Sequence, residues 1–216
     1  TRGGVPTTGA SSVVLKAAVT QPSAHGYLTI FPTGTVRPLA SSINFPPGTT
    51  VSNSIVATLG PAGTVDVFNV QGTTHVVLDV EGWFGVEGAG AGARYHPVVP
   101  SRIYDSRDTQ AVGPGSTLTV AVGGLGGVPA TAARAVVLNV AVTQPTAESY
   151  LTLFPTGTVK RFASSMNFGT GQTVSNKVVA QLGSGWQVDI FNAVGSTHVV
   201  IDVEGWFGLD TIASGA

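Results

Sequence analysis

The side chains with the clearest capacity for chemistry lie in one short segment that occurs twice. THVVLDVEGWFG spans residues 74–85 and THVVIDVEGWFG spans residues 197–208, and the copies differ only at Leu78 and Ile201. Each copy contains an imidazole, two carboxylates and an indole among valines. These residues are His75, Asp79, Glu81 and Trp83 in the first copy and His198, Asp202, Glu204 and Trp206 in the second.

Strand alternation separates this segment into two faces. It directs Val76, Leu78 and Val80 into a core and places His75, Asp79 and Glu81 on the opposite side. Trp83 joins that opposite side unless Gly82 introduces a bulge. An aromatic ring that stacks on the C–H face of a sugar, beside carboxylates that accept hydrogen bonds from hydroxyls, is suited to carbohydrate binding. Two alternatives stay open: a polar ladder facing solvent, and tryptophans that pack inward.

Four further residues recur at the same spacing and combine aromatic with amide chemistry. Tyr27 and Asn44 belong to the first copy, and Tyr150 and Asn167 to the second. We include them as candidate sugar-binding residues.

Catalysis is the weaker interpretation. Asp79 and Glu81 on one strand face would be about 6–7 Å apart, which is near the carboxylate spacing of glycosidases. However, two acids on the same strand do not flank a sugar-sized cleft. The chain has no cysteine and no G-x-S-x-G segment, and its four histidines lack the spacing of a metal site. We predict a protein that is not an enzyme and that needs no metal or cofactor.

Composition limits the partners. Only 10% of residues are charged and the net charge is −1, which gives no electrostatic footprint for nucleic acid or an anionic membrane. No apolar run reaches the roughly 18 residues of a membrane helix, so we predict no membrane insertion.

An internal duplication sets the organisation of the chain. An offset of 123 aligns residues 3–85 with residues 126–208 without a gap, and 54 of these 83 positions are identical. Short alternating runs separated by Gly, Pro and Asn, without helix-period segments, predict an all-β fold. Alternation in AVVLNVAVTQ places Val136, Leu138, Val140 and Val142 on one side. The sequence predicts two tandem antiparallel units, each sandwich-like or barrel-like.

The predicted boundaries are a first unit at 1–86, a Gly/Ala linker at 87–94 and a second unit at 95–216. The second unit opens with residues that have no counterpart in the first. If this opening supplies strands, the first unit has an uncovered edge, and exposed strand edges invite pairing. The first unit then closes without it, shares it with the second unit, or is completed by another segment or by a second copy in a homo-oligomer. Within this opening, SRIYDSRD predicts an ion pair between Asp105 and Arg107.

The ordered runs of the second unit resemble a repeat domain common in secreted actinobacterial proteins. PSRIYDSRD at 100–108 is similar to the P-x-R-hydrophobic-hydrophobic-D-[ST]-R opening of that domain. The same domain type is found in a streptomycete haemagglutinin that recognises L-rhamnose and D-galactose. The resemblance covers nearly the whole chain, except that the first unit lacks the opening motif.

The resemblance and the residues together predict a lectin-like function. We expect a secreted, extracellular or cell-surface module that binds a glycan or a cell-wall polysaccharide. The alternative is a structural or adhesive surface protein that assembles through strand pairing, and a glycosidase is a distant third.

Overall fold

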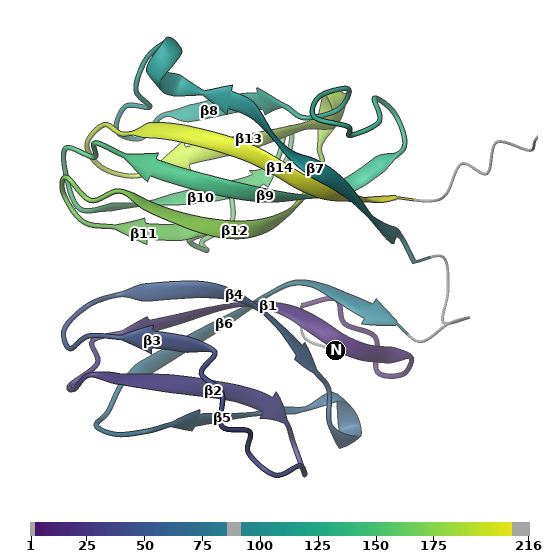
Figure 1. The fold of residues 1–216 in the computed structure, drawn as a ribbon, viewed down its shortest axis with the longest axis vertical. Helices are drawn as coiled ribbons and strands as arrows, with labels where there is room; N and C mark the ends of the chain where they lie inside the picture. The colour runs from purple at the N-terminus through teal and green to yellow at the C-terminus, as the bar shows by residue number, and fades with distance from the viewer. Residues whose placement is uncertain (1–2, 86–91, 209–216) are drawn as a thin grey trace, which may run out of the picture. The chain divides into compact units, whose positions relative to one another are not determined.

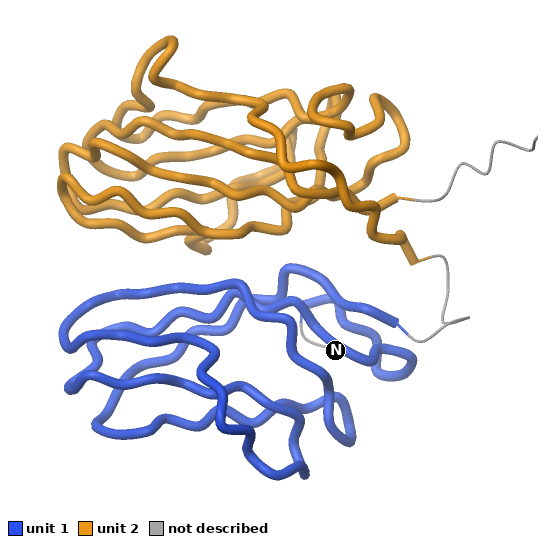
Figure 2. Tube along the Cα trace, in the orientation of Figure 1, with its two compact units in different colours: residues 1–91 blue, residues 92–216 orange. Residues whose placement is uncertain are grey.

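The computed structural model describes residues 3–85 and 92–208, and the chain forms two compact units (Figure 2). Unit 1 is residues 1–91 and unit 2 is residues 92–216. The boundary between them falls inside the predicted linker 87–94, of which residues 87–91 lie outside the described residues.

Unit 2 is a pair of four-stranded antiparallel sheets (Figure 1). One sheet has the order β12-β9-β14-β7 and the other has the order β11-β10-β13-β8. The strands are β7 (Arg94–Asp105), β8 (Thr117–Ala121), β9 (Ala133–Thr143), β10 (Ser149–Pro155), β11 (Met166–Phe168), β12 (Val174–Gln181), β13 (Gln187–Asn192) and β14 (His198–Gly208).

Unit 1 is a pair of three-stranded antiparallel sheets with the orders β4-β1-β6 and β3-β2-β5. Its strands are β1 (Ala10–Thr20), β2 (Gly26–Pro32), β3 (Ile43–Phe45), β4 (Val51–Thr58), β5 (Val65–Asn69) and β6 (His75–Gly85). Each strand of unit 1 corresponds to a strand of unit 2 at the offset of 123 residues. The two strands of unit 2 without a counterpart are β7 and β8, one at the edge of each sheet.

Three short 3-10 turns connect the strands: η1 (Pro61–Gly63), η2 (Ser106–Asp108) and η3 (Ser184–Trp186). Within the described ranges, no helix has the length and apolar character that a membrane-spanning helix needs.

Alternating apolar residues explain why these segments form a sandwich. On β9, the four predicted core residues Val136, Leu138, Val140 and Val142 are all 0% exposed. Their β-branched and γ-branched side chains suit a pleated, half-buried surface. The predicted all-β fold of two antiparallel sandwich-like units is therefore confirmed.

The two cores differ in extent. Unit 2 has one continuous core cluster, to which the loop before β8 contributes Val112, β8 contributes Val120 and the residue just after β8 contributes Val122. The buried residues of unit 1 form two separate clusters, one around Leu15 and one around Leu28. Within residues 3–85 unit 1 has no counterpart of these three side chains, and it has Ala17 where the core of unit 2 has Val140.

Candidate functional site

Strand β14 presents its side chains on two faces, as the alternation predicts. Its core side carries three residues that are 0% exposed: Val199, Ile201 and Val203. Its other side carries the predicted polar residues His198, Asp202 and Glu204, all partly exposed. The duplicated segment therefore combines a core-forming face with a polar face.

Trp206 lies on the core side of β14. The pairing of β14 shifts register between Val203 and Gly205 against both neighbouring strands, as a β-bulge does. The extra residue reverses the alternation, so that Trp206 packs against the core cluster. Its ring stacks on the imidazole of His96, with ring centroids 3.9 Å apart and an interplanar angle of 11°. The indole therefore contacts both the core cluster and the imidazole of His96.

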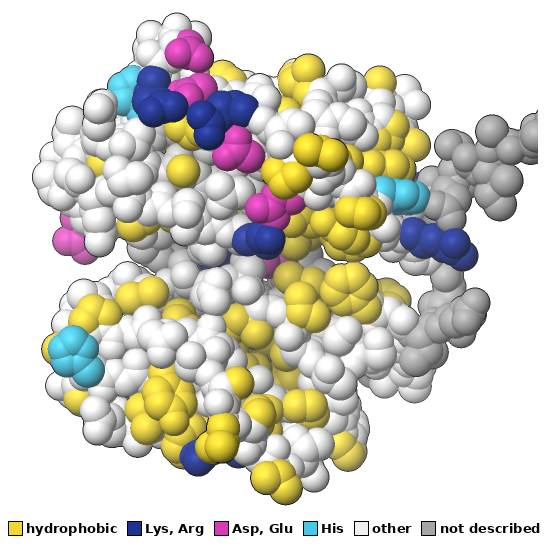
Figure 3. Space-filling view, in the orientation of Figure 1, with side chains coloured by type: hydrophobic (Ala, Val, Ile, Leu, Met, Phe, Trp, Pro, Cys, Tyr) yellow, Lys and Arg dark blue, Asp and Glu magenta, His cyan; other side chains and the backbone are white. Residues whose placement is uncertain are grey.

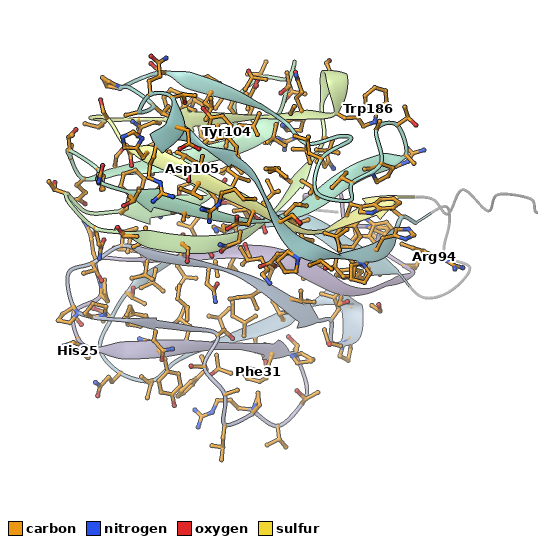
Figure 4. The ribbon with its side chains drawn as sticks, turned by 45° about the horizontal axis from the view of Figure 1, so that its top comes forward. His25, Phe31, Arg94, Tyr104, Asp105 and Trp186 are labelled. Carbon is orange, nitrogen blue, oxygen red and sulfur yellow. The ribbon has the colours of Figure 1, made fainter. Side chains whose placement is uncertain are left out.

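Asp202 forms an ion pair with Arg102 of β7. The Nε and Nη2 of Arg102 donate to the two carboxylate oxygens of Asp202, over 2.9 and 3.3 Å. Arg102 also lies 3.5 Å from Asp105, and the predicted pair between Asp105 and Arg107 is confirmed by hydrogen bonds from the backbone and side chain of Arg107. Those hydrogen bonds lower the pKa of Asp105 to about 2. Figure 4 labels Asp105 near the end of β7.

His198 is also engaged by the opening segment of unit 2. Ser106, in η2, is 0% exposed and lies 3.1 Å from the Nδ1 of His198. The Oγ of Ser106 accepts a hydrogen bond of 2.7 Å from the backbone N–H of Val199. One serine thus binds both the side chain and the backbone at the start of β14.

Glu204 pairs with Lys177 of β12. Together these pairs form a row of acidic and basic side chains over the β12-β9-β14-β7 sheet, and blue and magenta side chains lie side by side across the visible face of unit 2 in Figure 3. The polar face of unit 2 is therefore a cross-strand ladder whose members bind one another.

Unit 1 has a comparable acid–base pair in a different arrangement. Glu81 accepts a hydrogen bond from Ser54 and interacts with Lys16, while burial raises the pKa of Glu81 and lowers the pKa of Lys16 to about 8. Lys16 and Ser54 are cross-strand neighbours, and unit 2 has Asn139 and Lys177 at the corresponding positions. Each unit thus keeps one lysine beside this glutamate, on the central strand in unit 1 and on the edge strand in unit 2.

The remaining residues of β6 have surroundings different from those of their counterparts in β14, because no strand lies beyond β6 in the described part of unit 1. The prediction that Val76 and Leu78 lie in a core is wrong for unit 1: each is 39% exposed, whereas the corresponding Val199 and Ile201 of unit 2 are fully buried. Trp83 is 38% exposed. His75 and Asp79 are present at this edge without the serine and arginine that bind their counterparts in unit 2.

The predicted tyrosines and asparagines lie on the other sheet of each unit. Tyr27 of β2 is directly opposite Asn44 of β3, and Tyr150 of β10 is directly opposite Asn167 of β11. The structure therefore brings the predicted residues together as two groups in each unit, on separate sheets, and not as one site.

An aromatic ring and a cation that are not among the predicted residues accompany each of these pairs. In unit 1 the ring of Phe68 is 6.5 Å from that of Tyr27, and the guanidinium carbon of Arg37 lies 3.7 Å from the Phe68 centroid. In unit 2 the Nζ of Lys160 lies 4.5 Å from the centroid of Phe191. The sequence does contain a cue for these cations. The same loop ends in a basic residue in both copies, Arg37 in TGTVR and Lys160 in TGTVK.

We call these sets the aromatic faces of the two units. Their members are Tyr27, Arg37, Asn44 and Phe68 in unit 1 and Tyr150, Lys160, Asn167 and Phe191 in unit 2.

The loops that carry the cations are held against the sheet. Thr29 donates a hydrogen bond of 2.7 Å to the carbonyl of Ala40, and Thr152 makes the equivalent bond of 2.8 Å to Ala163. These contacts set the cation over the aromatic ring while other loop side chains project outward. Leu39 and Phe162 are fully exposed at corresponding positions.

Comparisons with known proteins assign no family. No protein-family model and no curated protein matches the chain. One solved structure, the crystal structure of infectious bursal disease virus VP2 subviral particle, is 9% identical with a TM-score of 0.20. The alignment covers 93% of this chain and 66% of that chain, and so weak a likeness carries no argument.

Proposed function

We propose that the chain is a non-enzymatic carbohydrate-binding protein that acts outside the cell or at its surface, and that the aromatic faces hold the sugar. The observation that carries this proposal is the recurrence, in both units, of a tyrosine, an amide and a cation over a second aromatic ring. Tyr150 is 37% exposed, and Asn44 and Arg37 are exposed.

The chemistry of this combination suits a sugar. The ring of a tyrosine packs on the C–H face of a pyranose, and an amide binds hydroxyls as both donor and acceptor. Arg37 and Lys160 supply only donors, so each face favours a glycan rich in acceptor oxygens, either hydroxyl or carboxylate.

The other group of predicted residues has a stronger structural role in unit 2. His198, Asp202 and Glu204 each bind a side chain of their own unit. A sugar at this position would have to displace Ser106, Arg102 or Lys177 and leave a carboxylate or an imidazole without its partner. We therefore assign the sugar to the aromatic faces.

Two similar faces would give avidity for a polymeric glycan, because the second binding event is intramolecular. A monovalent sugar should accordingly bind weakly to each face, and a cell-wall polysaccharide should bind more tightly to the whole chain.

Calorimetry with L-rhamnose, D-galactose and a cell-wall polysaccharide tests the proposal. We expect saturable binding that falls to about half the stoichiometry in Tyr27→Ala or Tyr150→Ala and disappears when both are changed. The matched variant Tyr27→Phe keeps the ring and should retain most of the binding. Absence of heat at millimolar sugar and with the polysaccharide would refute the proposal.

A specific observation also favours the alternative function, assembly through strand pairing. The edge strands β6 and β5 of unit 1 have no partner on one side within residues 3–85, whereas the corresponding strands of unit 2, β14 and β13, pair with β7 and β8 there.

A further inference from the structure

Unit 2 shows how the two edges left open in unit 1 are covered. In unit 2, residues 94–121 form the opening segment, in which β7 pairs with β14 and β8 pairs with β13. The corresponding strands of unit 1, β6 and β5, have no partner on that side within residues 3–85. One segment with two strands therefore completes both sheets of one sandwich and is lacking in the other.

The acceptor edges of the two units are nearly identical in sequence. β6 and β14 differ at one position, Leu78 against Ile201, and β5 differs from residues 188–192 of β13 only at Val67 against Ile190, while Gln187, which pairs with Ala121, corresponds to Thr64. Apart from these three positions, the side chains of β14 and β13 that pair with the opening segment are present in unit 1.

The apolar residues of this edge are exposed only in unit 1. Val76, Leu78 and Val67 are 39–40% exposed, whereas Val199, Ile201 and Ile190 are 0% exposed. A contiguous apolar edge beside unpaired strands is the feature that binds an added strand. It is also a cost to unit 1 in water, so covering it is favourable.

Two polar side chains of unit 1 correspond to side chains of unit 2 that bind the opening segment. Asp79 corresponds to Asp202, which binds Arg102 in a bidentate pair. Asn69 corresponds to Asn192, whose amide Nδ2 donates to the carbonyls of Val112 and Gly113 over 3.0 and 3.2 Å. An incoming segment with the pattern of unit 2 supplies an arginine for Asp79 and two carbonyls for Asn69.

A glycine on β6 leaves room for an aromatic ring. In unit 2 the corresponding Gly205 faces Tyr95, and a Cβ on Gly205 would lie 2.4 Å from the Tyr95 ring. A Cβ on Gly82 would meet nothing within 4 Å, and the backbone of Gly82 is not in the left-handed region. Nothing in the described part of unit 1 fills this space, whereas a tyrosine fills it in unit 2.

We propose that the open edge of unit 1 binds the opening segment of a further repeat unit of this kind. The occupant is a polypeptide segment whose first strand carries a tyrosine, an arginine and the Asp-Ser-Arg turn, and whose second strand alternates Thr with apolar residues. It adds one strand to β6 and one to β5, as residues 94–121 do in unit 2.

Stoichiometry excludes a second copy of residues 1–216 as a satisfactory occupant. These residues contain two acceptor edges and one opening segment, and that segment fills unit 2. A copy that donated its segment would expose its own β14 and β13, so exchange between copies leaves the number of uncovered edges unchanged. The occupant therefore has to bring an additional segment.

The test adds a fluorescent peptide of residues 92–122 to the full chain. We expect saturable binding of one peptide per chain, half-saturated at about 10 µM or below. Hydrogen–deuterium exchange should slow at β6 and β5 and stay unchanged at β14 and β13. Absence of binding at about tenfold higher concentration, or protection at β14 in place of β6, overturns the proposal.

Paired variants test the geometry of docking. Gly82→Ala should weaken binding about tenfold, because the new Cβ occupies the space of the incoming ring. A peptide with Tyr95→Ala should restore binding to that variant. Asp79→Arg should likewise weaken binding, and a peptide with Arg102→Asp should recover part of the loss. The control Val56→Ala, on the opposite edge strand β4, should leave affinity within about twofold.

A tethered form keeps the test decisive if the free peptide self-associates. Residues 92–125 are fused directly before Gly3, which recreates the connection that unit 2 has before Gly126. The thermal midpoint of unit 1 should rise toward that of unit 2, and Gly82→Ala should cancel part of the rise. An unchanged midpoint refutes the proposal, as does a chain that without any added segment is a stable dimer.

Discussion

The two units of this protein share 54 of their 83 aligned residues, and within the described residues only unit 2 has the opening segment. Unit 2 has a strand beyond β14 and a strand beyond β13, and its core is one continuous cluster. Unit 1 ends at β6 and β5, and its buried residues form two clusters. The strands they share align without a gap, so a comparison of the units shows what residues 94–121 contribute, alongside substitutions such as Lys16 against Asn139 and Ala17 against Val140.

That contribution is larger than two strands of backbone pairing. The opening segment places Ser106 against His198, Arg102 against Asp202 and His96 against Trp206. It also covers the residues that correspond to the exposed Val76 and Leu78 of unit 1. Completion of the sandwich therefore converts a polar face and an apolar edge into a packed, internally bonded structure.

The largest difference should come from matched core truncations. Ile201→Ala removes a side chain that is 0% exposed and should destabilise unit 2 by about 2–5 kcal/mol. Leu78→Ala removes a side chain that is already 39% exposed, so it should cost unit 1 less than about half of that. Hydrogen–deuterium exchange of β9 and β1 under increasing denaturant reports the two units separately. Equal losses would show that unit 1 has a covered edge in solution.

Much of this contrast follows from the sequence. The duplication and the alternation at Val136, Leu138, Val140 and Val142 predict the sandwich class and its core face. If the opening segment supplies strands, its lack in the first copy predicts an uncovered edge, and β6 and β5 have no partner on that side within residues 3–85. These predictions succeed because alternation and repeat length are properties of contiguous residues.

Features that depend on pairing between distant segments could not be predicted. The face of Trp206 depends on a bulge that arises from register against two other strands. The partner of Asp202 lies 100 residues away in the chain. The ring beneath Arg37 is that of Phe68 in β5, and two strands, β3 and β4, lie between the loop of Arg37 and β5 in the sequence. Periodicity places Tyr27 and Asp79 on outward faces but does not reveal that they occupy different sheets.

The second-largest difference should appear at the paired asparagines. Asn192 is 0% exposed, accepts from Ser149 and donates to three carbonyls. Asn192→Ala should cost unit 2 about 2–3 kcal/mol, because buried partners lose their hydrogen bonds. Of the four bonds that Asn192 makes, Asn69 has the counterpart of one, from its Nδ2 to the carbonyl of Gly72. Its Oδ1 is buried without a partner in the described residues. Asn69→Ala should therefore cost about 1 kcal/mol or less in the same exchange experiment. A larger loss in unit 1 would contradict the open edge.

A smaller difference is expected at the paired aspartates. Asp202→Asn weakens the partly exposed pair with Arg102 and should cost unit 2 about 0.2–1 kcal/mol. Asp79 has no arginine of the opening segment beside it, so Asp79→Asn should change the stability of unit 1 by less than about 0.3 kcal/mol. Denaturant titrations of both variants, with 1 M salt as a screening control, measure the two effects. Reducing-sugar release by Asp79→Asn and by the parent chain, compared in parallel, also tests the glycosidase alternative.

The smallest effect should be a loss of thermal stability at low pH that arises from Asp105 and therefore affects only unit 2. Arg107 lowers the folded pKa of this carboxyl from 3.8 to about 2. A depressed folded pKa gives stability that is fully present above the unfolded pKa and is lost as the pH falls through the folded pKa. The thermal midpoint of unit 2 should therefore fall between about pH 4 and pH 2, and Asp105→Asn should flatten that fall while lowering the midpoint at neutral pH. A parallel flattening in unit 1 would mean that the opening segment stabilises both sandwiches, and the contrast between a complete and an incomplete unit would then fail.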